Sequence, residues 1–267
     1  MCQRRTRAIR SRVGRRHLAV GLAPGPCRTR LGRARDRGRT PRARRATAGR
    51  SIISADKASS WVYAEEFLPE DDAVLAARER AAQLGASAVT PGTGAVLTLL
   101  AAASKARAVV EIGTGTGVAS LFLLRGMPED GVLTTIDSEV EHHRAAKESF
   151  ADAGFRPTRT RTISGRPLEV LPRLTDGAYD LVLLGLTSVG GLLESAPEYL
   201  AQAVRLLRQG GVLVVDHALW HDRVADPARR DEATTIVREL GRAVRADERL
   251  QPALLPVGDG LLVAVRR

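Results

Sequence analysis

The stretch Val109-Val110-Glu111-Ile112-Gly113-Thr114-Gly115-Thr116-Gly117 decides the fold. Apolar residues lead into one acid, three glycines follow at alternate positions, and a helix-like segment comes next. This order predicts a buried strand, a tight turn and the start of a helix. Glycine has no Cβ, so the backbone of such a turn can approach a ligand closely. We therefore expect a nucleotide-like cofactor on this turn.

From residue 108 onward, strand-like runs alternate with helix-like segments. We expect strands at 108–112, 131–137, 158–163, 179–184, 212–216, 251–257 and 260–266, and helices at 117–126, 139–153, 167–174, 195–208 and 229–246. This alternation predicts an α/β fold, with a doubly wound, seven-stranded, mostly parallel sheet that ends in an antiparallel hairpin. Ligands of such sheets bind beyond the carboxyl ends of the strands, at the switch point, where the glycine turn lies.

Charge divides the chain into two parts. Residues 1–50 contain 17 arginines and a single acid, whereas the remainder carries 24 basic and 29 acidic residues. The basic tail has almost no periodic apolar pattern, so we expect disorder over 1–50 and one folded domain over 51–267. The tail could bind nucleic acid nonspecifically, act as an export signal after Arg15-Arg16, or be an extension without a selected role. We favour the last interpretation.

Extra helices are expected before the alternating region, at residues 57–68, at 70–84, and from Thr90-Pro91 to about 105. The first two could form a layer on the core, or a lid or dimer arm beside the cofactor, and the sequence leaves both open. Both cysteines lie in the tail, so the domain has no disulfide framework. No apolar run approaches the length of a membrane span, and we expect a cytoplasmic protein without a membrane partner.

The glycine turn departs from the dinucleotide fingerprint. Val118 occupies the position where G-x-G-x-x-G needs its last glycine, and Glu111 stands two residues before the first glycine. An acid there suits a cationic ligand and disfavours a pyrophosphate. S-adenosylmethionine (SAM) carries a sulfonium and an ammonium group and no phosphate. Asp137, at the end of the second strand, could accept hydrogen bonds from ribose hydroxyls, and it could also cap the following helix.

These motifs resemble those of class I SAM-dependent methyltransferases. The resemblance is greater to O-methyltransferases of the catechol and caffeoyl-CoA type, through Glu111–Gly117, Leu133–Asp137, residues 203–211 and Leu255–Gly260. It implies that the protein transfers a methyl group from SAM to a hydroxyl of a small molecule, which could be aromatic. It also implies a homodimer. The expected cofactor-binding residues are Val89, Glu111, Gly113, Thr114, Gly115, Gly117, Ser120, Asp137 and Ser138.

The resemblance breaks where metal-dependent members hold their ion. Those members carry Ile-Asp-Ala-Asp-Lys after the fourth strand, where this chain has Leu184-Gly185-Leu186-Thr187-Ser188. After the fifth strand, Asp216-His217 replaces an Asp-Asn pair. Too few oxygen ligands remain for a hard cation, so we expect no divalent metal. We predict His217 as general base or acceptor-orienting group, and Asp216 as the residue that orients it. We expect His142 and His143 to face solvent.

Three functions are compatible with these observations. The first is an O-methyltransferase acting on a small hydroxylated molecule. The second is a SAM-binding regulatory protein whose acceptor site has degenerated, as the missing acids around Gly185 suggest. The third is an RNA methyltransferase guided by the basic tail, which ranks last because no Asn/Asp-Pro-Pro-Tyr type segment follows the fourth strand. We therefore expect no nucleic-acid partner.

Overall fold

Seven strands form one mixed sheet in the computed structural model, which describes residues 55–187 and 192–267. The spatial order is β3-β2-β1-β4-β5-β7-β6. The first five strands are parallel, β7 is antiparallel to β5, and β6 is antiparallel to β7. Their bounds are β1 Ala108–Ile112, β2 Val132–Asp137, β3 Thr160–Ser164, β4 Tyr179–Gly185, β5 Leu207–Asp216, β6 Leu250–Leu255 and β7 Leu261–Arg266. The expected doubly wound sheet with a terminal hairpin is confirmed.

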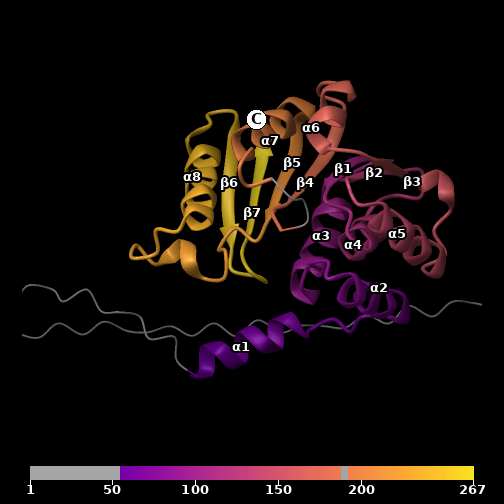
Figure 1. Cartoon of the computed structure of the whole chain (residues 1–267), viewed down its shortest axis with the longest axis horizontal. Coiled ribbons are helices and arrows are strands. Elements are labelled where there is room, and N and C mark those ends of the chain that lie inside the picture. The colour runs from indigo at the N-terminus through magenta and orange to yellow at the C-terminus, as the bar shows by residue number, and fades with distance from the viewer. Residues whose placement is uncertain (1–54, 188–191) are drawn as a thin grey trace, which may run out of the picture. The chain divides into compact units, whose positions relative to one another are not determined.

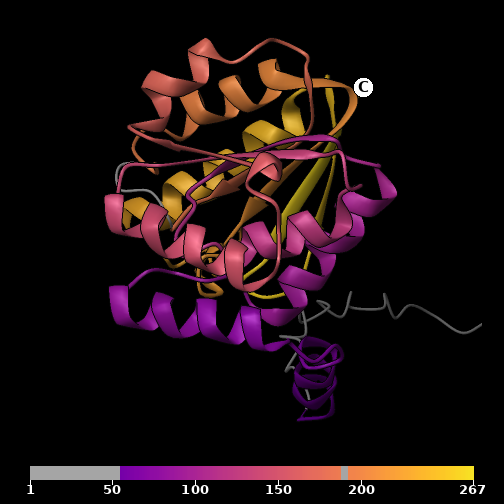
Figure 2. The same cartoon turned by 90° about the vertical axis from the view of Figure 1, so that its right-hand side faces the viewer.

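Helices cover both faces of the sheet, and Figure 2 shows the layers edge-on. One face carries α2 (Asp72–Leu84), α3 (Pro91–Ala103), α4 (Val118–Gly126) and α5 (Val140–Asp152). The other carries α6 (Pro167–Val170), α7 (Ala196–Leu206) and α8 (Glu232–Ala246). None of the helices in the described ranges is long and apolar enough to cross a membrane. The disorder expected for 1–50 falls outside the described residues, and the domain boundary at 51 stays a prediction.

Strand residues alternate between two apolar cores. Val110 and Ile112 of β1 belong to the core beneath α7 and α8, whereas Val109 belongs to the core beneath α3 and α4. Side chains of a strand point alternately to opposite faces, so a sheet covered by helices on both sides needs continuously apolar strands. This explains the apolar runs Leu181–Leu184 of β4 and Val212–Val215 of β5, and it makes Glu111 an exception within β1.

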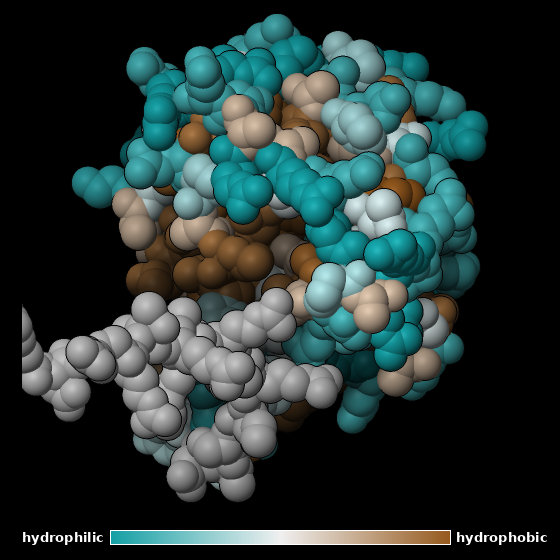
Figure 3. All heavy atoms as spheres, turned by 90° about the vertical axis from the view of Figure 1, so that its left-hand side faces the viewer, coloured by the Kyte–Doolittle hydropathy of each residue, from teal (hydrophilic) through white to brown (hydrophobic). Residues whose placement is uncertain are grey.

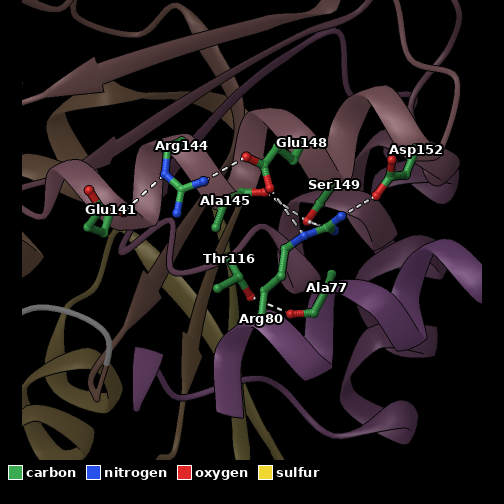
Figure 4. A network of polar contacts seen from close by, with 9 residues as sticks. All are labelled: Ala77, Arg80, Thr116, Glu141, Arg144, Ala145, Glu148, Ser149 and Asp152. Carbon is green, nitrogen blue, oxygen red and sulfur yellow. Dashed lines mark hydrogen bonds and ion pairs between the residues drawn. The ribbon is translucent and has the colours of Figure 1, made fainter. Parts of the chain in front are cut away.

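Helix α2 packs as a layer on the core. Val74 and Ala77 are fully buried on its inner face. Figure 4 shows the polar contacts that join α2 to α5, in which Arg80 donates to Ser149 Oγ at 3.1 Å and pairs with Asp152. Thr116 of the glycine turn donates to the Ala77 carbonyl at 2.7 Å. The helix therefore holds the turn from outside.

The first helix, α1 (Ala55–Glu65), is anchored through its last residue. Figure 1 shows α1 below the sheet, beyond α3. Glu65 is 7% exposed, and its two carboxylate oxygens accept hydrogen bonds from Gly92 N at 2.9 Å and Gly258 N at 2.7 Å. One carboxylate thus ties α1 to the start of α3 and to the turn between β6 and β7.

Most element boundaries lie within three residues of those expected, and β5 is the main exception. It begins at Leu207 rather than at residue 212, because Leu207 pairs with Tyr179 of β4 before a register shift. The sequence pattern favoured a turn at Gly210-Gly211. Strand β5 nevertheless continues through these two glycines, because it pairs with β4 on both sides of them. Helix α8 begins at Glu232, where the Asp231 side chain accepts from Thr234 N and caps it.

Candidate functional site

The glycine turn follows β1 in a backbone conformation that only glycine adopts easily. Gly113, Gly115 and Gly117 have φ values of 94°, 50° and 88°. The Gly113 amide donates to the Ile136 carbonyl of β2 at 2.9 Å. A Cβ on Gly117 would come within 2.9 Å of the Phe150 ring in α5. Gly117 therefore allows close packing of the turn on α5, whereas the first two glycines face the pockets described next.

Two small pockets flank the turn at the carboxyl ends of the strands. The first unites predicted cofactor residues with the predicted catalytic pair, since its lining includes Val89, Gly113, Thr114, Asp216 and His217. The second is lined by predicted Gly115 and Ser138, together with Glu139, His142 and Thr187. Ser87 belongs to both linings, so the pockets adjoin. The remaining predicted residues, Glu111, Gly117, Ser120 and Asp137, line neither pocket.

Glu111 is fully buried at the end of β1, underneath the turn. Its Oε2 accepts a short hydrogen bond from the Ser120 hydroxyl, which explains why Ser120 is turned away from the pockets. Its Oε1 has no hydrogen-bond partner among the described residues. Burial raises the pKa of Glu111 to about 7; the Ser120 and Thr135 hydroxyls oppose this shift, and the Asp137 charge adds to it. An orphaned carboxylate oxygen here is a ready acceptor for a cationic group.

Asp137 is occupied by contacts within the chain. Its Oδ2 accepts from the Gly115 amide at 3.0 Å, and its Oδ1 accepts from the Glu139 amide at 3.0 Å. The carboxylate therefore fixes the turn and the entry to α5. The expectation that His142 and His143 face solvent is wrong. His142 Nδ1 lies 3.2 Å from Asp137 Oδ2, and His143 is buried, with Nε2 at 3.0 Å from the Asp137 carbonyl oxygen.

Asp216 and His217 stand together at the end of β5. Nδ1 of His217 lies 2.8 Å from Oδ2 of Asp216, but the two groups are poorly aligned for a hydrogen bond. Burial disfavours the charged imidazole, yet the Asp216 carboxylate and the charge of Asp259 outweigh burial and raise the pKa of His217 above its ordinary value. A histidine with one nitrogen facing a carboxylate, beside a pocket, has the arrangement that a general base needs.

The end of β4 supplies no carboxylate to this site. Gly185 lines the first pocket and Thr187 lines the second, and Thr187 Oγ1 is buried without a partner in the described part of the chain. Residues 55–187 and 192–267 contain no group of three or more His, Cys, Asp or Glu side chains arranged to hold a metal. The expected absence of a divalent metal stays a prediction.

Comparison with known proteins places this site in a family. The sequence profile of the O-methyltransferase family matches residues 59–267. The chain belongs to the O-methyltransferase family. A relative from Mycobacterium tuberculosis, assigned as an O-methyltransferase, is 53% identical over 208 residues, which span 78% of this chain and 91% of the relative.

Solved structures agree with this O-methyltransferase in fold. A protein from Corynebacterium glutamicum is 36% identical and superposes with a TM-score of 0.70, covering 78% of this chain and 97% of that chain. The O-methyltransferase TomG from Streptomyces achromogenes, crystallised with SAM, is 30% identical with a TM-score of 0.67, covering 78% of this chain and 96% of that chain. The resemblance inferred from sequence motifs is thereby confirmed.

Among the residues near the O-methyltransferase site that sequence reasoning missed are Ser87, His142 and Asp259. Ser87 lies in a loop with no motif, so nothing in the sequence distinguished it. His142 is five residues after Asp137, on the first turn of α5, and that spacing brings it back toward the strand end. Asp259 was seen only as part of the hairpin turn, although it faces the loop after β5.

Proposed function

We propose that the protein transfers a methyl group from SAM to a hydroxyl of a small molecule. The observation that carries this proposal is the first pocket, where Gly113 and Thr114 of the glycine turn share one lining with Asp216 and His217. A donor held on the turn would therefore lie next to a histidine and a carboxylate of the same lining. Membership of the O-methyltransferase family and the SAM complex of TomG support the same assignment.

The residues of the turn suit SAM in charge and in shape. We assign Val89, Gly113, Thr114 and Gly115 to direct contact, because they line the two pockets. Glu111 lines neither pocket, so its assignment rests on the buried Oε1, which lacks a partner among the described residues and would accept from the ammonium group of a donor held on the turn. We assign supporting roles to three of the predicted residues: Ser120 holds Glu111, Asp137 holds the turn, and Gly117 packs it on α5. Ser138 lines the second pocket, next to the Asp137 carboxylate, and suits the ribose.

SAM supplies an already activated methyl group, so the chain has to align the acceptor and remove its proton. We assign the proton to Nε2 of His217, because Nδ1 faces Asp216 at 2.8 Å. Asp216 orients the imidazole and stabilises its charged form. The exposed fraction of the His217 side chain is 14%, so competing water has limited access to the base.

Calorimetry and turnover test this proposal together. We expect SAM to bind in calorimetry, and a panel of catechols and other hydroxylated aromatics to yield a methylated product. EDTA should leave the rate unchanged, because we expect no divalent metal. SAM binding without product from any acceptor would instead favour the rival function, a SAM-binding regulatory protein. Absence of SAM binding would contradict both functions.

We propose further that the protein is a homodimer with α1 in its interface. Trp61 of α1 is 46% exposed and Tyr63 is 70% exposed, and Phe67 just beyond the helix is 65% exposed, in a chain with only nine aromatic residues. Exposed apolar clusters of this kind mark interaction sites. Light scattering after size exclusion should give a dimer, and Trp61→Ser with Phe67→Ser should give a monomer. Leu99→Ser, at an exposed leucine of α3, is the matched control.

We also place the protein in the cytoplasm and assign it no nucleic-acid partner. Residues 51–267 contain no cysteine, so this domain does not depend on an oxidising compartment for disulfide formation. Fractionation of cells that express the full chain tests the location. Retention on immobilised RNA at about 0.15 M salt, compared with a chain that lacks residues 1–50, tests the partner.

A further inference from the structure

The loop after β5 has an unusual backbone. His217, Trp220, His221 and Asp222 all adopt positive φ values, between 50° and 61°, and none of them is glycine. Side chains with a Cβ rarely adopt this left-handed conformation, and they keep it only where surrounding contacts impose it. Such residues cluster at functional sites, so the contacts that impose this conformation are of interest.

The turn between β6 and β7 supplies those contacts. Backbone carbonyls of Gly260 and Asp259 accept from Ala218 N at 2.9 Å and Leu219 N at 2.8 Å. The Asp259 carboxylate accepts from His221 N at 2.6 Å through Oδ1. A Cβ on Gly260 would lie 2.4 Å from Leu219 Cγ, so the turn and the loop are in close contact.

The Asp259 contact differs from the others because it is made by a side chain, and because only one of the two carboxylate oxygens is used in it. Its Oδ2 is buried, makes no hydrogen bond within the described residues, and lies 3.5 Å from His221 Nδ1. The His221 ring packs edge-on against the His217 ring, with the centroids 6.5 Å apart. The Asp259 carboxylate therefore reaches the His217 imidazole both through the loop backbone and through the His221 ring.

We propose that Asp259 is a positioning residue, which holds the loop so that the imidazole of His217 faces the first pocket. The inference rests on the proposed function, in which His217 accepts the acceptor proton. Asp259 comes from the last hairpin of the chain, about 40 residues after the pair that it serves. Asp259 also acts on His217 through its charge, because the charges of Asp216 and Asp259 both raise the pKa of His217. In the described residues, the charged or titratable groups facing His217 are Asp216, Asp259 and His221.

Two substitutions separate the hydrogen bond from the charge. Asp259→Ala removes both, whereas Asp259→Asn keeps an oxygen that can accept from His221 N. We expect Asp259→Ala to lower kcat on the order of 10²-fold, as displacement of a catalytic group does, with KM and SAM affinity little changed. Asp259→Asn should recover most of kcat. It should also shift the rise of kcat with pH to lower pH, because the His217 pKa falls.

NMR titration of the histidine rings gives a readout that needs no turnover. Asp259→Ala should move the His217 ring signals and lower the pKa of His217. Asp247→Ala is the matched control, because Asp247 also caps a turn, by accepting from Arg249 N at 2.9 Å, at the start of β6. Asp247→Ala should leave the His217 signals in place. If Asp259→Ala does not fold, the lower His217 pKa in Asp259→Asn is the test.

Three outcomes would overturn the inference: unchanged His217 signals in the Asp259 variants, an unchanged kcat in Asp259→Ala, or a loss of SAM affinity that matches the loss of kcat. Failure of the proposed function has a different signature. In that case the wild-type chain would methylate no acceptor, while the Asp259 variants would still move the His217 signals, and the positioning role would stand.

Discussion

Replacing Glu111 with glutamine should make the free protein more stable at neutral and alkaline pH. The folded chain holds this carboxyl fully buried and raises its pKa from an ordinary 4.5 to about 7. An acid whose pKa is raised on folding contributes its stability at low pH, where it is protonated in both states. That contribution is lost as the pH rises from the unfolded pKa to the folded one, because the unfolded chain ionises first.

The expected difference in the free energy of unfolding between the wild type and Glu111→Gln follows from the folded and unfolded pKa values of Glu111. Full ionisation of Glu111 in the folded protein costs on the order of 3 kcal/mol relative to the unfolded chain. Between about pH 5 and about pH 8, the wild type should therefore lose roughly 2–3 kcal/mol that Glu111→Gln keeps. Urea unfolding of both proteins at a series of pH values measures this difference directly, since titrations of all other groups cancel.

Glu239→Gln, on the exposed side of α8, is the matched control and should show no such difference. A wild-type-minus-Glu111→Gln difference that stays constant across this pH range would refute the reasoning. Binding gives a second check, because an ammonium group needs the ionised carboxylate. SAM affinity should then rise with pH toward about 7 in the wild type and be weaker and flat in Glu111→Gln. Equal SAM affinities of the wild type and Glu111→Gln above that pH would show that Glu111 does not contact the cofactor.

Three further substitutions test separate parts of the site and the fold. His217→Gln should lower kcat about 10²–10⁴-fold with an unchanged SAM dissociation constant, and equal losses in both would contradict its role as a base. Gly117→Ala should cost clearly more stability than Gly154→Ala in thermal unfolding, because both have positive φ but only Gly117 would meet the Phe150 ring. Gly241→Ala in α8 should raise the free energy of unfolding by roughly 0.5–1 kcal/mol, since the new methyl group meets nothing within 4 Å; a loss of stability would mean that the glycine serves another purpose.

The sequence predicted the architecture because hydrophobic periodicity dominates each element. The run Ala108–Ile112 was placed as a strand without error, and the alternation with helices fixed the parallel order. Extension of β5 to Leu207 was not predictable in this way. It depends on pairing with Tyr179, a residue nearly 30 positions away, and on a register shift that local pattern does not encode.

Prediction of the site succeeded for residues in local motifs and failed for residues joined by tertiary contacts. The glycines and Asp137 stand at strand ends, where sequence position alone puts them near a ligand. The motifs predicted that Asp137 accepts from the ribose, caps the following helix, or does both. In the structure its carboxylate accepts from Glu139 N, at the start of that helix, and from Gly115 N, which was not predicted. The hydrogen bond between Asp259 and His221 joins residues 38 positions apart, and hydrophobic periodicity does not predict a contact of this kind.

Hydrophobic pattern also did not predict the hollow beside α8. Figure 3 looks at the side that carries α8 and β6, where apolar surface gathers in a depression. A hollow of about 530 Å³ there is lined by Val215, Val237, Leu240 and Leu262, with Gly241 at its edge. Each of these residues reads as an ordinary core position, because a pattern shows which face of an element is apolar and not whether the neighbouring element fills the space over it.

The Glu65 carboxylate has a consequence for the order in which the chain folds. It joins Gly92 and Gly258, and the second contact spans 193 residues. Closing so long a loop is slow compared with forming the local helices and the parallel strands. During synthesis, α1 emerges from the ribosome before most of the chain, but its anchor is incomplete until the last hairpin follows. Docking of α1 should therefore be among the final folding steps, and a docked α1 indicates that the C-terminal strands have already formed.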